Sequence, residues 1–206
     1  MMKTNKHTKI IELCGLPHTG KTTTVSAIMD LTKIWGVSSH LIIERASLCP
    51  IRDKLNPLFN LWTVTSLLSE YIEAVDRGVD IVIADRGLLD ALIWVNLFSK
   101  DGAFDQERES MDLLSSIPVL KKNLLVSYFF FADINVVLNR REDLLSEKLE
   151  GRIVNQRTLN GYMLSFEQVK QNFETPIVKV DTTNLSLKQT IQMVTRDLKV
   201  RLQIGS

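Results

Sequence analysis

The chain has 206 residues, 45% of them hydrophobic, and a formal net charge of +1 at pH 7. This length and composition suit one globular domain with a full core, so we expect a single domain over residues 1–206. The near-neutral charge argues against nucleic acid or an anionic membrane as a partner and points to small molecules.

The cysteine count and the N-terminus indicate a cytoplasmic protein. Two cysteines, Cys14 and Cys49, make no disulfide framework and no metal-ligand spacing. The first apolar run is interrupted by Glu12 and is too short for a signal or membrane segment. We therefore expect no membrane association.

The first predicted strand, residues 9–14, leads into a phosphate-binding loop of the form G-x-x-x-x-G-K-[ST]. Its glycines let successive N–H groups point at phosphate oxygens, Lys21 adds a positive charge that should project into a solvent-filled site, and the Thr22 hydroxyl can bind Mg²⁺. The alternative is a glycine-containing turn before an ordinary helix. The residues expected to bind the nucleotide are Gly15, His18, Thr19, Gly20, Lys21, Thr22 and Thr23.

The second predicted strand, residues 40–44, follows an amphipathic helix that ends near Gly36. It ends in Glu44, which is followed by Arg45. A carboxylate there could orient or deprotonate an attacking hydroxyl, and an arginine could pair with a substrate anion. A surface ion pair at a strand end is the alternative.

The next predicted helix carries aromatic side chains that suit either the core or a nucleotide base. Phe59 and Trp62 are candidates for stacking on a base, as is Tyr71, although aromatics at helical spacing more often belong to the core. The residues predicted to face inward are Leu61, Leu68, Tyr71, Ile72 and Val75.

The third predicted strand, residues 80–85, ends in Asp85, and Arg86 and Gly87 follow it. An aspartate beside a phosphate loop can hold Mg²⁺, and the arginine can bind a phosphate or the acceptor with two hydrogen bonds. Asp85 could also simply cap the following helix. That helix, residues 88–98, is apolar almost all round, so Trp94 is expected in the core; burial in the monomer or a homodimer contact would explain it.

A charge-dense segment follows the fourth predicted strand, residues 125–132. We interpret residues 139–155 as a lid whose arginines, Arg140, Arg141 and Arg152, could stabilise a transferring phosphoryl group. A solvated helix face is the alternative. Beyond it the sequence predicts a helix up to Thr175, a fifth strand over 177–181 and a last helix opened by a capping box at Ser186 with Leu187 inward.

Five strands alternating with helices predict an α/β fold of the P-loop NTPase type: a five-stranded parallel sheet with helices on both faces and a lid. Ligands of such sheets bind beyond the carboxyl ends of the strands. That is where Glu44, Asp85 and the phosphate loop are expected to meet.

In order and spacing these motifs resemble the thymidylate kinase and deoxynucleoside kinase group of P-loop kinases. The resemblance implies that Glu44 contacts a sugar or acts as base, that Asp85 and Arg86 meet substrate and the magnesium water shell, and that Arg140 and Arg141 contact phosphates. The chain departs from both subgroups. Thymidylate kinases follow the second-strand acid with Pro-Gly-Gly and carry an aromatic residue or histidine at Gly87, whose small size could admit a larger substrate. Deoxynucleoside kinases have Glu-Pro and Glu-Arg-Ser at the two sites.

These features together predict an Mg²⁺-dependent phosphotransferase that uses ATP as donor and a nucleoside monophosphate or nucleoside as acceptor. Two alternatives stay open: a P-loop kinase with a non-nucleotide hydroxyl acceptor, and a nucleotide-binding regulatory protein without useful transfer activity. The predicted catalytic residues are Lys21, Glu44, Asp85, Arg86, Arg140 and Arg141. The predicted substrate-binding residues are Glu44, Arg45, Phe59, Trp62 and Arg86, and the predicted metal ligands are Thr22 and Asp85.

Overall fold

The computed structural model describes residues 8–54, 56–99, 122–144 and 155–204. In these ranges the strands are β1 (Lys9–Gly15), β2 (Ser39–Ile42), β3 (Ile81–Asp85), β4 (Leu124–Phe131) and β5 (Ile177–Asp181). The helices are α1 (Lys21–Ile34), α2 (Pro57–Asp76), α3 (Leu88–Ser99), α6 (Ile134–Leu144), α7 (Gln156–Val169) and α8 (Leu187–Leu202), with short 3₁₀ turns η1 (Arg45–Ser47) and η2 (Lys170–Asn172).

The strands form one parallel sheet in the order β2-β3-β1-β4-β5. This confirms the predicted α/β fold. Because β1 lies between β3 and β4, its register sets Leu13 beside Asp85 and Gly15 beside Phe130. The loop after β1 therefore begins next to the residues that end β3.

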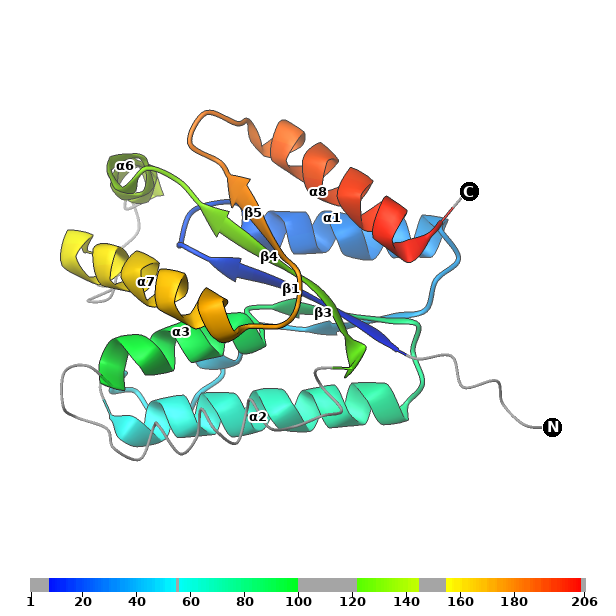
Figure 1. Ribbon diagram of the computed structural model, residues 1–206, viewed down its shortest axis with the longest axis horizontal. Helices are drawn as coiled ribbons and strands as arrows, with labels where there is room; N and C mark the ends of the chain where they lie inside the picture. The colour runs from blue at the N-terminus through cyan, green and yellow to red at the C-terminus, as the bar shows by residue number, and fades with distance from the viewer. Residues whose placement is uncertain (1–7, 55, 100–121, 145–154, 205–206) are drawn as a thin grey trace.

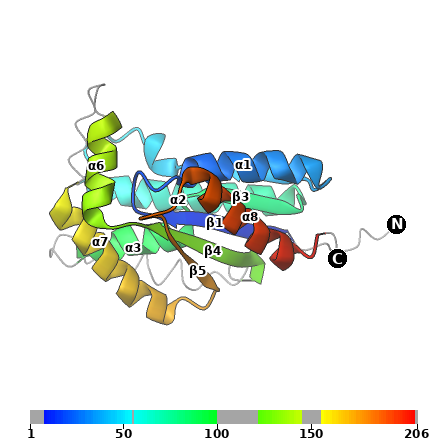
Figure 2. The same cartoon turned by 90° about the horizontal axis from the view of Figure 1, so that it is seen from above.

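Helices cover both faces of the sheet (Figure 1). On one face, α1 packs on β1 and β3 with α8 beside it, and Val25, Ile28 and Val194 are buried there. On the other face lie α2, α3 and α7, and Tyr162 and Phe166 are buried there. Figure 2 shows α6 across the end of the sheet to which the strands point, so the carboxyl edge is bordered by helices.

Two helix faces differ from the prediction. On α2, Leu61 and Ile72 are 46% and 57% exposed, because the helix turns a neighbouring stripe with Val64 and Leu67 toward the core. On α8 the predicted capping box at Ser186 is confirmed, but Leu187, in the first turn, is 45% exposed. The hydrophobic periodicity of a sequence predicts where a helix lies more accurately than it predicts which residues stand at the edge of the buried stripe.

None of the helices in the ranges 8–54, 56–99, 122–144 and 155–204 is both long and apolar enough to cross a membrane.

Candidate functional site

The phosphate loop joins β1 to α1 at the carboxyl edge of the sheet. Gly15 has φ 117° and Gly20, the N-cap of α1, has φ 86°. A Cβ atom on Gly15 would lie 2.0 Å from the carbonyl oxygen of Phe130 on the neighbouring strand. Only glycine allows β1 and β4 to approach this closely where the loop begins.

Lys21 is buried in the loop with 6% of its surface exposed, so the expectation that it projects into solvent was wrong. Its Nζ donates a hydrogen bond to the carbonyl oxygen of Leu16, 2.5 Å away. Burial, and then the positive charge of Arg86, lower the pKa of Lys21 to about 7. The lysine is thus held inside the loop, where phosphate oxygens would compete with Leu16 for its protons.

Thr22 and Asp85, the two predicted metal ligands, are in contact. The Thr22 hydroxyl donates to Asp85 Oδ2 at 2.7 Å. The hydroxyl stands in the first turn of α1 and the carboxylate at the end of β3, which are adjacent because β3 pairs with β1. The pair unites a carboxylate and a hydroxyl oxygen, both ligands that Mg²⁺ accepts.

Arg86 follows Asp85 and lies at the centre of a charge cluster that is buried except at Glu44. Its φ is 65°, and its backbone N–H donates to the carbonyl oxygen of Leu13. Its Nε lies 2.8 Å from Glu44 Oε1 and its Nη1 3.0 Å from Asp90 Oδ1. Burial disfavours the charged guanidinium, but Asp90 and Glu44 outweigh that cost and raise the pKa of Arg86.

Asp90, on the first turn of α3, was missed by the sequence analysis. It is 3% exposed, and its Oδ1 also accepts hydrogen bonds from the Tyr162 hydroxyl at 2.5 Å and from the Gly15 N–H at 3.3 Å. It therefore links the start of the phosphate loop, Arg86 and α7. The signal available in the sequence was an acidic residue four positions after Arg86, at the start of the predicted helix and close enough along the chain for an ion pair.

Glu12 is a second buried carboxylate, fully enclosed in the middle of β1. It accepts hydrogen bonds from the Tyr71 hydroxyl, the Ser127 hydroxyl and the backbone N–H groups of Leu88 and Leu89. Burial raises its pKa, and these hydrogen bonds offset part of that effect. Two of its donors are the first free N–H groups of α3, so Glu12 fixes the N-terminus of that helix.

Glu12 also explains Gly87. A Cβ atom on Gly87 would lie 2.3 Å from the Glu12 carboxyl carbon. The space beside Gly87 is therefore filled by Glu12, which corrects the expectation that this glycine leaves room for a larger substrate.

A cavity of about 180 Å³ opens beside the phosphate loop, between α2, α3 and α7. It brings together the predicted residues Gly15, Glu44, Arg45, Phe59 and Arg86. Sequence reasoning missed several of its lining residues, which come from helices; they are Asp90, Trp94, Phe98, Leu159 and Tyr162. Trp94, expected in the core, is partly buried against it and also lines the cavity.

The Arg45 side chain is held by α2. Its Nε and Nη2 donate to Ser66 Oγ at 2.9 and 2.7 Å, and its Nη1 lies 3.2 Å from Glu70 Oε1.

Trp62, predicted to stack on a base, stands 5.9 Å from the Arg45 guanidinium and is outside the lining of this cavity. Tyr71 is buried against Glu12 and belongs to the core.

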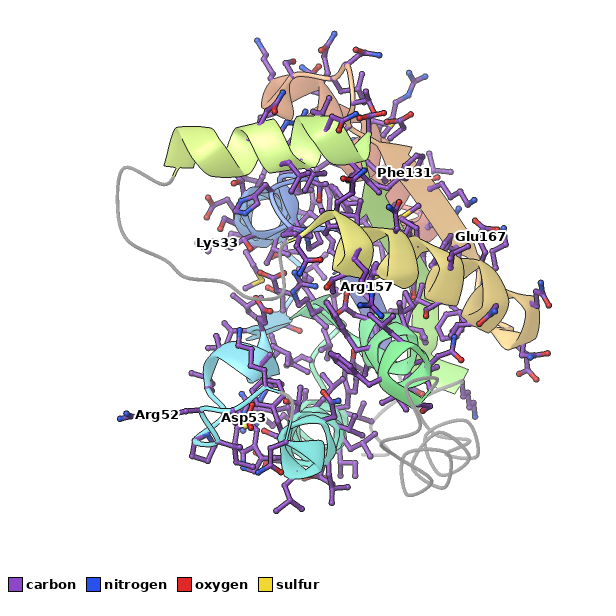
Figure 3. The ribbon with its side chains drawn as sticks, turned by 90° about the vertical axis from the view of Figure 1, so that its left-hand side faces the viewer. Lys33, Arg52, Asp53, Phe131, Arg157 and Glu167 are labelled. Atoms are coloured by element: carbon purple, nitrogen blue, oxygen red, sulfur yellow. The ribbon has the colours of Figure 1, made fainter. Side chains whose placement is uncertain are left out.

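The predicted lid begins within α6, because residues 139–144 form the last part of this helix. Arg140 donates to the carbonyl oxygens of Thr182 and His18, at 2.6 and 3.4 Å, and so ties α6 to the phosphate loop and to the segment after β5. The side chain of Arg141 and all of Arg152 lie outside the described residues. Figure 3 looks onto this edge of the molecule: α6 crosses it on one side, and the segment with Arg52 and Asp53 lies on the other, beside α2.

Comparison with known proteins shows the fold. No protein-family model and no curated protein matches the sequence. A solved structure of deoxyadenosine kinase from M. mycoides, with dCMP and a flexible dCDP bound, is similar with a TM-score of 0.68 at 19% identity, over 93% of this chain and 99% of that one. Thymidylate kinase from Candida albicans gives a TM-score of 0.58 at 16% identity over 94% and 92%. The YorR protein from Bacillus subtilis, in complex with phosphorylated GDP, gives 0.59 at 13% over 96% and 100%.

Proposed function

We propose that this protein is a kinase that transfers the γ-phosphoryl group of ATP to a nucleoside or a nucleoside monophosphate. The observation that carries the proposal is the adjacency of two half-sites. A phosphate loop with Lys21 and Thr22 lies beside a cavity lined by Glu44 and Arg86, and Gly15 lines that cavity as well. The structural likeness to a deoxyadenosine kinase and a thymidylate kinase supports the same reading.

The donor half would hold the ATP phosphates. Loop N–H groups at the N-terminus of α1 suit anionic oxygens, and Lys21, already enclosed by the loop, would exchange the Leu16 carbonyl for a phosphate oxygen. Arg140 would keep the loop in place through the His18 carbonyl. A fixed cradle of this kind supplies most of the catalysis in phosphoryl transfer, because positioning and charge stabilisation dominate that reaction.

The chain also has residues that fit Mg²⁺. Thr22 and Asp85 would hold the ion, directly or through water, because their oxygens already face one another at 2.7 Å. When bound, Mg²⁺ neutralises charge on the β- and γ-phosphate oxygens.

The acceptor half would hold and activate the nucleophile. Glu44, with its side chain 39% exposed, can orient or deprotonate an attacking group at the cavity wall. Arg86 can contact the transferring phosphoryl group or the acceptor, and Glu44 and Asp90 fix its direction. Phe59, Trp94 and Phe98 give the cavity aromatic walls suited to a flat base.

Acceptor-dependent ADP release tests the proposal. Purified protein with ATP and Mg²⁺ should release ADP when a suitable nucleoside or nucleoside monophosphate is added, and the phosphorylated product should appear by mass spectrometry. Release with none of a panel of both kinds would overturn it. Release only with other hydroxyl compounds would indicate a non-nucleotide acceptor, and tight ATP binding without turnover would indicate a regulatory protein.

A further inference from the structure

The cavity also indicates which of the two proposed acceptors, a nucleoside or a nucleoside monophosphate, binds there. This inference rests on the proposed function. Both arginines that line the cavity form ion pairs. Arg86 faces Glu44 and Asp90 at 2.8 and 3.0 Å, and Arg45 faces Glu70 at 3.2 Å. Both guanidinium side chains are largely covered, with 16% and 14% of their surfaces exposed. Each arginine at the cavity is therefore already neutralised by a carboxylate.

This pairing leaves little net positive charge for a dianion. Among the lining side chains in the described ranges, the remaining cation is Lys54, which is exposed, while Glu44 and Asp90 bring negative charge to the wall. A phosphate group that took Arg86 away from Asp90 would leave a carboxylate that is 5% exposed without its partner. Separating such a buried pair is strongly unfavourable.

The chemistry of Glu44 points in the same direction. The second pKa of a phosphate group is about 6, so the attacking oxygen of a monophosphate is already ionised at neutral pH and needs no base. A hydroxyl keeps its proton at that pH and gains from a carboxylate within hydrogen-bond reach. A carboxylate at this wall is useful to a hydroxyl and repels a phosphate.

We propose that the acceptor is an uncharged nucleoside, phosphorylated on a hydroxyl group, and not a nucleoside monophosphate. The hydroxyl oxygen forms a bond to the γ-phosphorus, and the bond from that phosphorus to the β-phosphate oxygen breaks. The hydroxyl proton passes to Glu44 and then to solvent. The products are ADP, a nucleoside monophosphate and one proton.

The first test compares matched pairs of acceptors, each nucleoside against its own monophosphate, at saturating ATP and Mg²⁺. We expect kcat/KM for monophosphate formation to exceed that for diphosphate formation about a hundredfold or more for the best base, which corresponds to ~2.7 kcal/mol. Equal or better turnover of the monophosphate would overturn the inference but leave the proposed function standing. Turnover of neither class would overturn the proposed function itself.

The second test removes the charge that neutralises Arg45. Glu70→Gln should narrow the nucleoside-to-monophosphate ratio about 3- to 10-fold, because Arg45 then offers uncompensated positive charge to a phosphate. Glu73→Gln is the matched control. It lies on the same helix, pairs with Arg77 on the exposed surface and is not among the described residues that line the cavity, so the ratio should stay within about twofold of that of the parent protein. An unchanged ratio in Glu70→Gln, or an equal change in both variants, would overturn the charge argument.

Discussion

Lys21 is the residue whose environment departs most from expectation. It was expected in solvent and is buried, and burial together with Arg86 brings its pKa to about 7. Triphosphate oxygens would add negative charge within the loop and favour the charged ammonium. The pKa of Lys21 should therefore rise when nucleotide binds, and the protein should take up a proton at any pH between the two values.

This coupling can be measured by calorimetry. At pH 8.5 the free protein holds Lys21 mostly neutral, while bound nucleotide restores its charge, so we expect uptake of nearly one proton per ATP. Titrations in Tris and in HEPES, which differ in ionisation enthalpy, would show this as a difference in apparent binding enthalpy. At pH 6 Lys21 is charged in both states, and its contribution should vanish.

Two variants separate Lys21 from other groups. Lys21→Met should abolish the proton uptake at pH 8.5 and greatly reduce phosphoryl transfer. Lys33→Met removes a lysine that lies on the same helix beside Asp30, with its side chain 72% exposed, and should retain both. Uptake that persists in Lys21→Met would show that another group takes the proton.

At the same scale, the sequence predicted that residues after the strands gather at one edge, and it missed most of the helix residues that line the cavity, Phe59 on α2 being the exception. Glu44 and Arg86 line the cavity and Asp85 contacts Thr22, because parallel strands end at one edge. Asp90, Tyr162 and Trp94 were not predicted there, because only the packing of α3 against α7 brings them to the cavity. Hydrophobic spacing cannot distinguish a side chain facing the core from one facing a cavity inside it.

Among the elements, α3 is the one on which the site most depends, since Arg86 precedes it and Asp90 lies on its first turn. Glu12 anchors it from β1 through the N–H groups of Leu88 and Leu89. The φ of Arg86 is 65°, and a residue in this sparsely populated conformation keeps it only when the surrounding structure holds it there. We therefore expect the carboxylate of Glu12 to position Arg86 indirectly, through the start of α3.

Replacing Glu12 should affect stability and catalysis together. Glu12→Gln keeps one acceptor oxygen but turns an NH₂ group toward groups that themselves donate. We expect the free energy of unfolding to fall by about 2–3 kcal/mol and kcat to fall more than KM rises. Urea denaturation and steady-state kinetics would measure the two effects.

Tyr71→Phe provides the control for Glu12. It removes one hydrogen bond to the same carboxylate from α2 and leaves the two bonds to α3 intact. Its stability should fall by ~1 kcal/mol while kcat stays near that of the parent. If kcat fell equally in both variants, the positioning role of Glu12 would be wrong and its role purely structural.

The elements themselves were largely predictable. The buried strands read as continuous apolar runs, and β5 was placed at its observed bounds, Ile177–Asp181. β2 ends at Ile42, two residues before the predicted end, because Glu44 and Arg45 belong to the turn η1 and its cap. Such ends depend on which backbone groups find partners, and apolar spacing does not contain that information.

In the molecule as a whole, the two half-sites lie at the same edge of one sheet. The phosphate loop joins β1 to α1, and the cavity is walled by α2, α3 and α7 on the other face of the sheet. Asp90 joins them through Gly15 and Tyr162. Binding at either half should therefore stabilise the native state as a whole, and each ligand should raise the midpoint of one common unfolding transition.

Thermal unfolding would test this directly. A ligand at a hundred times its Kd adds about 2.7 kcal/mol to the free energy of unfolding, which for a chain of this size shifts Tm by ~5–10 °C. ATP with Mg²⁺ should give such a shift in the parent protein and little in Lys21→Met, whereas the best nucleoside acceptor should give a similar shift in both. A nucleoside shift lost together with the ATP shift would show that the cavity depends on the loop lysine, and a second transition moved by one ligand alone would show that the two halves unfold separately.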